Sequence, residues 1–423
     1  MKMLDGCFMQ VKRFYLIYIC LQLLICVSTG LLASYAPFFE NLYYISDFLN
    51  CACIGIMICD YSNKRIIFSK NKIIELFFGL LLLYILLSIL WSDYNWHNTI
   101  KRVKYVLGAF VMFIVVRNHL DYRNYHYIIR ILLFFQMMNL GLVGYQNFIL
   151  HLHPDFCNGI FGFTTYANGI EGTFCLGISL LSVIYYIDGK WNFVCSSFFL
   201  GVSCVICALA EIKIYFVILA ITVLFAIIMR KCTPKRLVRI VFVVCGIVAL
   251  LLMSYSILSI IMPDNLRVFE NIDKAAAYED RSTYAGRLNT IDFVYRRVFE
   301  NNFFYSLFGT GLGTSSDNYI YELGKMFSDE GFIGVFLLYL VILVSMYHII
   351  VAKVTRSSIS SENFFSGVFA GVIAISVIVW NCTFTNKTYI VFFFLGIGNV
   401  VCEEKNLVNN IKNMFIGKGD EDK

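Results

Sequence analysis

Proline and charged residues are scarce in this chain of 423 residues, which contains 4 prolines and only 15% charged residues. A soluble domain has about 25% charged residues, so a single water-soluble globular domain is excluded. Hydrophobic residues make up 59% of the chain, which is more apolar surface than one globular core can bury. The composition therefore predicts an integral membrane protein.

Cysteine and histidine are absent from residues 263–330, the longest polar segment of the chain. The 15 cysteines lie almost entirely within apolar runs, so a disulfide framework is excluded for this segment. Cys51 and Cys53 have no matching second pair, and we therefore expect no zinc site there. The sequence contains neither a Ser-His-Asp set nor a metalloprotease helix motif, and we expect no metal and no cofactor.

A basic face and an internal repeat are also lacking. The net charge is only +6, and the basic residues stand in short loops, so we expect no nucleic-acid binding. The paired, glycine- or proline-broken spans of inverted-repeat transporters are not visible. An apolar run from Phe14 to Leu32 follows Lys12 and Arg13 without a convincing cleavage pattern, and we expect it to be retained as the first membrane span.

Twelve apolar runs have about the length that a transmembrane helix needs. They cover residues 14–34, 38–59, 73–91, 102–119, 127–150, 170–187, 193–210, 212–229, 239–262, 331–351, 364–381 and 388–402. The continuous run 193–229 is too long for one span, and a tight hairpin with residues 210–213 at its tip divides it into two.

The charges of the connecting loops predict the orientation. If the N-terminus is cytoplasmic, the inner segments contain 21 Lys and Arg residues, whereas the short outer loops contain only Lys387. This distribution follows the rule that positive charge stays inside. We therefore predict an all-α polytopic membrane protein with about 12 transmembrane helices, both termini cytoplasmic, and one large extracytoplasmic loop between spans 9 and 10.

The large loop is the part of the chain where chemistry on a polar substrate is expected. Residues 263–330 contain 18 of the 62 charged residues in about a sixth of the chain length, and such a segment must stay in water. The predicted organisation is an N-terminal transmembrane bundle at 1–262, the extracytoplasmic helical loop at 263–330, three spans at 331–404 and a cytoplasmic tail at 405–423.

Basic residues break the charge rule at two places on the outer face. Lys101, Arg102 and Lys104 stand at the outer start of the fourth span, and Lys213 stands beside Glu211 at the tip of the predicted hairpin. These cations could form a cradle for an anionic lipid carrier such as a polyprenyl diphosphate, with Arg giving bidentate contacts. The alternatives are contacts with headgroup phosphates and a simple ion pair at the hairpin tip.

The loop contains three local patterns. Gly309, Gly311 and Gly313 alternate with other residues, which predicts either a turn whose amides point at an anion or a flexible link; the P-loop ending is missing. An amphipathic helix over 288–298 is expected to lie on the membrane surface. A further helix, capped by Ser315 or Ser316, is expected to run toward residue 330. The acidic and basic side chains that it is expected to expose are Asp317, Glu322 and Lys325.

The order of these motifs resembles the O-antigen ligase and O-antigen (Wzy-type) polysaccharide polymerase family. Members combine ten to fourteen spans with one large extracytoplasmic loop in the C-terminal half. Similar loop motifs here are Gly286-Arg287, Phe308-Gly309-Thr310-Gly311, the region 317–322, and Gly331-Phe332-Ile333-Gly334. Two further motifs of the family have counterparts in this chain. Residues Gly162-Phe163 through Asn168 are similar to its motif at the outer end of a span, and Glu211-Ile212-Lys213 is similar to its short outer hairpin.

The resemblance implies a bacterial enzyme of the cytoplasmic membrane that transfers glycan from undecaprenyl diphosphate to an acceptor hydroxyl outside the membrane. It implies that Arg287 and Lys213, together with Arg102, neutralise the leaving diphosphate without a metal. Asp317 or Glu322 would serve as the base that accepts the proton of the hydroxyl. Lys101, Lys104, Gly309, Gly311 and Asn318 complete the predicted substrate-binding set.

The resemblance leaves the reaction open between two members of the family. Ligases attach glycan to lipid A core and carry a histidine in the long loop, which this chain lacks; this favours a polymerase of O-antigen, capsule or exopolysaccharide. Its further partners would be the lipid bilayer, a chain-length regulator and a flippase. Two other classes stay open, namely a lipid-linked oligosaccharide flippase or transporter and a division-associated protein of the peptidoglycan-polymerase type. A transporter would need several charges at mid-bilayer positions.

Overall fold

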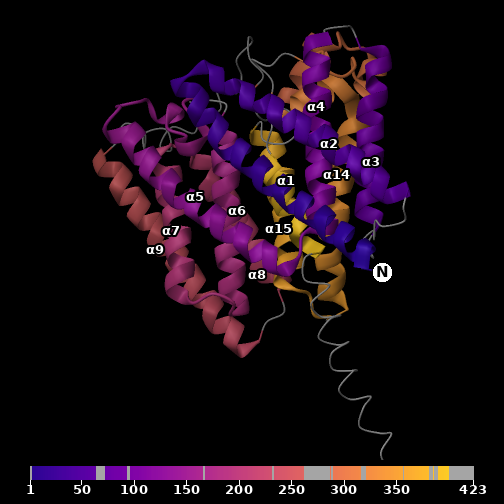
Figure 1. Ribbon diagram of the computed structural model, residues 1–423. Coiled ribbons are helices and arrows are strands. Elements are labelled where there is room, and N and C mark those ends of the chain that lie inside the picture. Colours follow the sequence, from indigo (N-terminus) through magenta and orange to yellow (C-terminus); the bar gives the residue numbers. More distant parts are fainter. Residues whose placement is uncertain are drawn as a thin grey trace, which may run out of the picture.

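Figure 1 shows the computed structural model of the protein, and every regular element in the described part is a helix. The structure describes residues 2–62, 72–92, 96–164, 167–230, 233–261, 286, 289–315, 321–355, 357–380, 384 and 389–399. The longer helices are α1 (Lys2–Tyr35), α2 (Leu42–Ser62), α3 (Lys72–Leu87), α4 (Trp96–His119), α5 (Tyr122–Phe148), α6 (Asn168–Asp188), α7 (Phe193–Leu209), α8 (Lys213–Met229), α9 (Pro234–Ile261), α14 (Glu322–Val354), α15 (Ser361–Val379) and α16 (Tyr389–Gly396).

Short helices connect or cap the longer ones. On the N-terminal side these are η1 (Pro37–Asn41), η2 (Ser88–Trp91), η3 (Pro154–Phe156) and η4 (Gly159–Phe161). The polar segment contains α12 (Thr290–Phe293), η6 (Val294–Val298) and α13 (Phe303–Phe308), and η7 (Ile397–Asn399) follows α16. The amphipathic helix expected over 288–298 is therefore a single α turn followed by a π turn, and Leu288 lies outside the described residues.

Seven helical stretches in the described part are long and apolar enough to cross a membrane. They are Arg13–Tyr35, Pro37–Cys59, Ile73–Trp91, Tyr122–Phe148, Asn168–Asp188, Glu322–Val354 and Ser361–Val379. Many large apolar side chains on these helices, such as Leu83 and Phe134, face outward, as expected of surfaces in contact with lipid. The chain is thus a helical membrane protein, and the count of twelve spans stays a prediction.

The hairpin predicted for residues 193–229 is confirmed. Asn192 caps α7 by accepting a hydrogen bond from the amide of Cys195, and α7 ends at Leu209. Glu211 takes a positive φ of 53° in the turn, and α8 begins at Lys213. The chain turns back here. One continuous apolar helix over residues 193–229 would be too long for the bilayer, whereas each of the two helices has 17 residues.

The buried centre of the bundle is built around α6, which packs against α7, α8, α9 and α15. Small residues on α6 let aromatic rings approach its backbone. A Cβ at Gly177 would lie 2.2 Å from a ring carbon of Phe394, and one at Gly172 would lie 2.7 Å from the ring of Trp380. In Figure 1, α5, α7 and α9 lie on one side of this centre, and α3, α4 and α14 lie together on the other.

Helix α14 changes character at Gly331. Its first part, up to Glu330, is polar but buried, and its second part carries exposed Phe332 and Phe336. Gly331 breaks the helix with φ 65° and ψ −164°, a conformation that is essentially restricted to glycine. A Cβ there would lie 2.4 Å from the carbonyl oxygen of Leu307. The break therefore lets α13 and the loop after it pack directly against α14.

Candidate functional site

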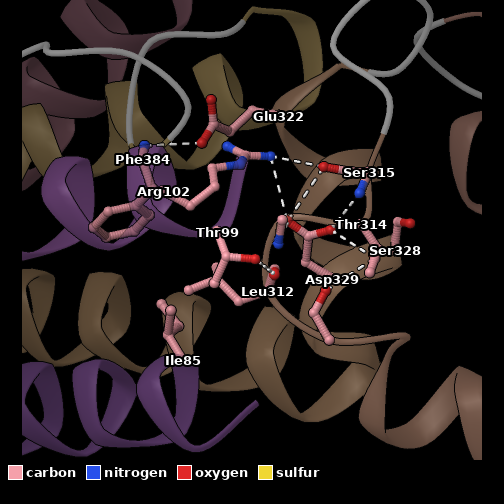
Figure 2. A network of polar contacts seen from close by, with 12 residues as sticks. Ile85, Thr99, Arg102, Leu312, Thr314, Ser315, Glu322, Ser328, Asp329 and Phe384 are labelled. Carbon is pink, nitrogen blue, oxygen red and sulfur yellow. Dashed lines mark hydrogen bonds and ion pairs between the residues drawn. The ribbon is translucent and has the colours of Figure 1, made fainter. Parts of the chain in front are cut away.

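Arg102 is the centre of a buried polar network at the N-terminal end of α4 (Figure 2). The residue is only 8% exposed, although it lies near the start of α4 (Trp96–His119). Its Nη2 donates a hydrogen bond of 2.8 Å to Ser315 Oγ and lies 3.5 Å from Asp329 Oδ2. The guanidinium thus joins α4 to residues 309–315, which we call the glycine-rich loop, and to α14.

Asp329 organises the loop around its carboxylate. It accepts hydrogen bonds from the amides of Gly313, at 3.1 Å, and Ser315, at 2.7 Å. The hydroxyls of Thr314 and Ser315 also donate to it, both at 3.2 Å. Asp329 is 1% exposed, so its charge is balanced by this ring of donors and by Arg102. Sequence reasoning missed Asp329, and the only local signal is a pair of acids directly before Gly331.

The sequence leaves Gly309, Gly311 and Gly313 open between an anion-directed turn and a flexible link, and the structure shows hydrogen-bonded backbone at all three. The amide of Gly309 donates to the carbonyl of Tyr305, and the amide of Gly311 donates to the carbonyl of Asp329. The amides that point at an anion are those of Gly313 and Ser315, and the anion is the internal carboxylate of Asp329. Whether Gly309 and Gly311 also contact a substrate stays a prediction.

The same loop is tied to the ends of α3 and α4. Ser92 Oγ and Thr99 Oγ1 both donate to the carbonyl of Leu312 at 3.0 Å. The backbones approach so closely that a Cβ at Gly311 would lie 2.3 Å from Ser92 Cα. At Gly313 a Cβ would lie 2.7 Å from the amide nitrogen of Thr99. Glycine is required at both places, because φ is also positive.

Two residues that were expected to be exposed are buried, and this prediction was wrong. Glu322 is 0% exposed and accepts a 2.8 Å hydrogen bond from the amide of Phe384, and Lys325 is 3% exposed. The reason is that α14 begins at Glu322, so that its first turns pack inside the bundle; the earlier residues 316–320 lie outside the described part. Figure 2 shows the carboxylate of Glu322 on the side of Arg102 away from Asp329.

The network is closely packed. A space of about 10 Å³ adjoins Arg102, Asp329 and Glu330, which is about enough for one water molecule. Tyr84 closes one side by donating to the backbone carbonyl of Glu330 at 2.9 Å. A diphosphate cannot enter this space, so any contact between Arg102 and a substrate would need the loop to move. In the structure as it stands, Arg102 holds the loop in place.

The other predicted cations lie in different surroundings. On α4, Lys101 is exposed, whereas Lys104 Nζ lies 3.0 Å from Asp47 Oδ2 and over the ring of Tyr44. At the hairpin tip, Lys213 Nζ lies 3.7 Å from Glu211 Oε2. Burial raises the pKa of the Glu211 carboxyl, and Lys213 opposes this effect. Thus the structure does not bring these lysines into the Arg102 network through any contact that it describes.

Several predicted site residues lie outside the described part of the chain. Arg287, Asp317 and Asn318 are among them, and their roles stay predictions. Gly286, the neighbour of Arg287, is described and buried. Among the described residues, no group of three or more His, Cys, Asp and Glu side chains could hold a metal ion.

Comparison with models of known protein families gave no match for this chain, and comparison with curated proteins gave none either. The resemblance to O-antigen polymerases and ligases therefore stays a prediction that rests on the order of short motifs. The helical membrane architecture and the contacts of Arg102 are compatible with this resemblance.

Proposed function

We propose that this protein is a membrane-embedded polymerase of polyprenyl-diphosphate-linked oligosaccharide repeat units. It would build an O-antigen, a capsular polysaccharide or an exopolysaccharide on the outer face of the bacterial cytoplasmic membrane. The observation that carries the proposal is Arg102, a buried cation that Ser315 and Asp329 hold beneath the glycine-rich loop at one end of the helical bundle. A buried charge in a membrane protein is expensive to maintain and marks a functional site.

The proposed reaction is a displacement at the anomeric carbon of the donor glycan. An acceptor hydroxyl attacks this carbon, the bond between the carbon and the diphosphate oxygen breaks, and the carrier diphosphate leaves with the electron pair. The hydroxyl proton passes to a carboxylate, for which Asp317 and Glu322 are the candidates; Glu322 is buried in this structure and would serve only after the loop moves. Positive charge from Arg287, Lys213 and a loop held by Arg102 would stabilise the developing negative charge on the leaving group.

The contacts of Arg102 support a positioning role for it in this scheme. Its guanidinium is engaged by Ser315 and Asp329, and it fixes the segment that leads from Gly313 toward the predicted base at residue 317. Glu322 lies on the other side of the same guanidinium (Figure 2). A rigid support of this kind keeps reacting groups in place more accurately than a mobile loop would.

The location of buried charge favours an enzyme over a transporter. Glu75 and Arg117, 3.3 Å apart, stand in the first turn of α3 and the last turn of α4. Glu171 and Glu362 stand in the first turns of α6 and α15. These charges lie near helix ends, whereas a polar path across the bilayer would need charges at its middle.

Deletion of the gene, followed by gel analysis of the surface glycan, tests the proposal. We expect the polymer ladder to disappear while a single repeat unit survives. Carrier-linked polymer that never reaches lipid A core would indicate a ligase instead, and repeat units trapped on the cytoplasmic leaflet would indicate a flippase. An unchanged glycan profile would overturn the proposal.

Complementation of the deletion strain then tests the site. Arg287→Ala should give no polymer at normal membrane abundance, because the leaving diphosphate loses its principal cation. Arg297→Ala is the matched control, since Arg297 is an exposed arginine of the same segment and is assigned no role. Wild-type glycan from Arg287→Ala would remove Arg287 from the site.

A further inference from the structure

A second polar site lies at the opposite end of α14 from Arg102. A cavity of about 590 Å³ opens where the C-terminal ends of α8 and α14 meet the N-terminal ends of α9 and α15, and this volume is typical of a ligand site. Its lining combines basic, hydroxyl and apolar side chains, among them Arg230, Arg236, Lys353, Ser357, Ser358 and Phe364.

Arg230 is the fixed part of this cavity. It is only 6% exposed, and its Nε donates to Asp188 Oδ1 at 3.0 Å while its Nη2 pairs with Oδ2 of the same carboxylate. Its Nη1 donates to the carbonyl of Ile359 at 3.3 Å, and its guanidinium lies 4.5 Å from the centre of the Phe364 ring. These contacts hold a positive group in one place at the wall of the cavity.

Positive charge exceeds negative charge around the cavity. Arg236 Nη2 lies 3.3 Å from Asp188 Oδ1, so that Arg230 and Arg236 share a single carboxylate. The third cation, Lys353, is exposed at the end of α14. Three cations against one carboxylate leave a surplus of two positive charges among these residues, which would attract an anion.

The length of α14 indicates the depth of the cavity in the membrane. From Phe332, just after the break at Gly331, to Lys353 the helix advances 21 residues, and at about 1.5 Å per residue this is about 32 Å. The hydrocarbon core of a bilayer is about 30 Å thick. If this part of α14 crosses the bilayer, the cavity at its C-terminal end lies at headgroup depth on the side opposite to Arg102.

The polar and apolar parts of the lining suit a phosphate that is joined to acyl chains. The two serines offer hydroxyl donors beside the basic groups, while Met229, Ile349 and Phe364 offer apolar surface toward the bundle. Basic pockets between transmembrane helices bind the headgroups of anionic lipids. A soluble phosphate would use the same cations but would gain nothing from the apolar wall.

We propose that this cavity binds the phosphate of an anionic phospholipid from the adjacent leaflet. The headgroup would lie between Lys353, Arg236 and the two serines, and Arg230 would set the position of Arg236 through their common partner Asp188. The bound lipid would contact the ends of α8, α9 and α14. Helices α8 and α9 are consecutive, whereas α14 lies far from them in the sequence. This site does not depend on the proposed polymerase activity.

Lipid binding to the purified full-length protein tests the proposal. The melting temperature in a neutral detergent would be measured with phosphatidylglycerol, with phosphatidylcholine of the same acyl chains, and with inorganic phosphate. We expect phosphatidylglycerol to raise the melting temperature and to bind at least fivefold more tightly than phosphatidylcholine. A rise with inorganic phosphate of equal size would support the anion site with a soluble ligand as its occupant.

Variants connect the effect to the cavity. Arg236→Gln with Lys353→Gln should remove most of the preference for phosphatidylglycerol, whereas Lys235→Gln should leave it unchanged, because exposed Lys235 does not line the cavity. Lys353→Arg keeps the positive charge and should keep the preference for phosphatidylglycerol. This result would show that the loss in the double variant comes from the lost charge and not from substitution at the position. Equal binding of both lipids by the wild type, or an unchanged preference in the double variant, would overturn the proposal.

Discussion

At the scale of single residues, the pair of Arg102 and Asp329 shows how a membrane protein keeps a charge inside. Neither group could be buried alone, since an isolated charge in an apolar interior costs many kcal/mol. Two backbone amides and two hydroxyls complete the coordination of the carboxylate, so that the glycine-rich loop takes its shape from Asp329. The residue most important for the geometry is therefore one that carries no motif of its own.

Replacement of Asp329 should destabilise the protein strongly. We expect Asp329→Ala to lower the free energy of unfolding by about 3–5 kcal/mol, because the buried Arg102 would lose its ion pair with Asp329 and the amides of Gly313 and Ser315 would lose their acceptor. The measurement is reversible unfolding of the purified protein in detergent. The control is Asp292→Ala, which breaks an exposed pair with Arg296 and should cost less than about 1 kcal/mol. Equal effects of the two substitutions would contradict the role given to Asp329.

At the scale of secondary-structure elements, α14 links the two polar sites of the molecule. Its N-terminal part supplies Asp329 and Glu330 to the surroundings of Arg102, and its C-terminal end supplies Lys353 to the basic cavity. The break at Gly331 separates the polar part from the apolar part and admits the backbone of α13. A straight helix would carry the same residues but would exclude the loop from Asp329.

The break predicts the effect of a single methyl group. Gly331→Ala should destabilise the protein by at least about 2 kcal/mol, because alanine strongly disfavours this conformation and its Cβ would lie 2.4 Å from the carbonyl oxygen of Leu307. Gly246→Ala in α9 is the control, since a Cβ at this position would meet nothing within 4 Å and a helical alanine is favourable by about 1 kcal/mol. Thermal unfolding of both variants would compare them, and a Gly331→Ala protein as stable as the wild type would contradict the strain at this position.

At the scale of the whole molecule, two polar sites lie at opposite ends of the helical bundle, joined by α14. The end that contains Arg102 also contains α12 and α13, and the end that contains the basic cavity contains Lys235 and Arg236 at the start of α9. The excess of basic residues in the loops at the second end favours a cytoplasmic location for it. The proposed transfer reaction requires this orientation, because the carrier-linked glycan is used outside.

Labelling in intact cells would determine the orientation. A membrane-impermeant maleimide should react with Arg297→Cys without permeabilisation and with Lys235→Cys only after it, since both positions are exposed at opposite ends of the bundle. The wild-type protein is the background control, because many of its cysteines are buried in apolar helices. The reverse pattern would place the Arg102 network in the cytoplasm and would exclude an extracytoplasmic polymerase.

The sequence by itself determined the membrane class and the hairpin of α7 and α8, because hydropathy acts over neighbouring residues, whereas it left Gly309–Gly313 open between a turn and a flexible link. Only the tertiary structure decided that Arg102 is buried, that its partners are Ser315 and Asp329, and that Glu322 lies inside. Arg102 and Ser315 are 213 residues apart in the chain. The burial of a charge depends on which distant groups meet it in space, and no local pattern contains that information.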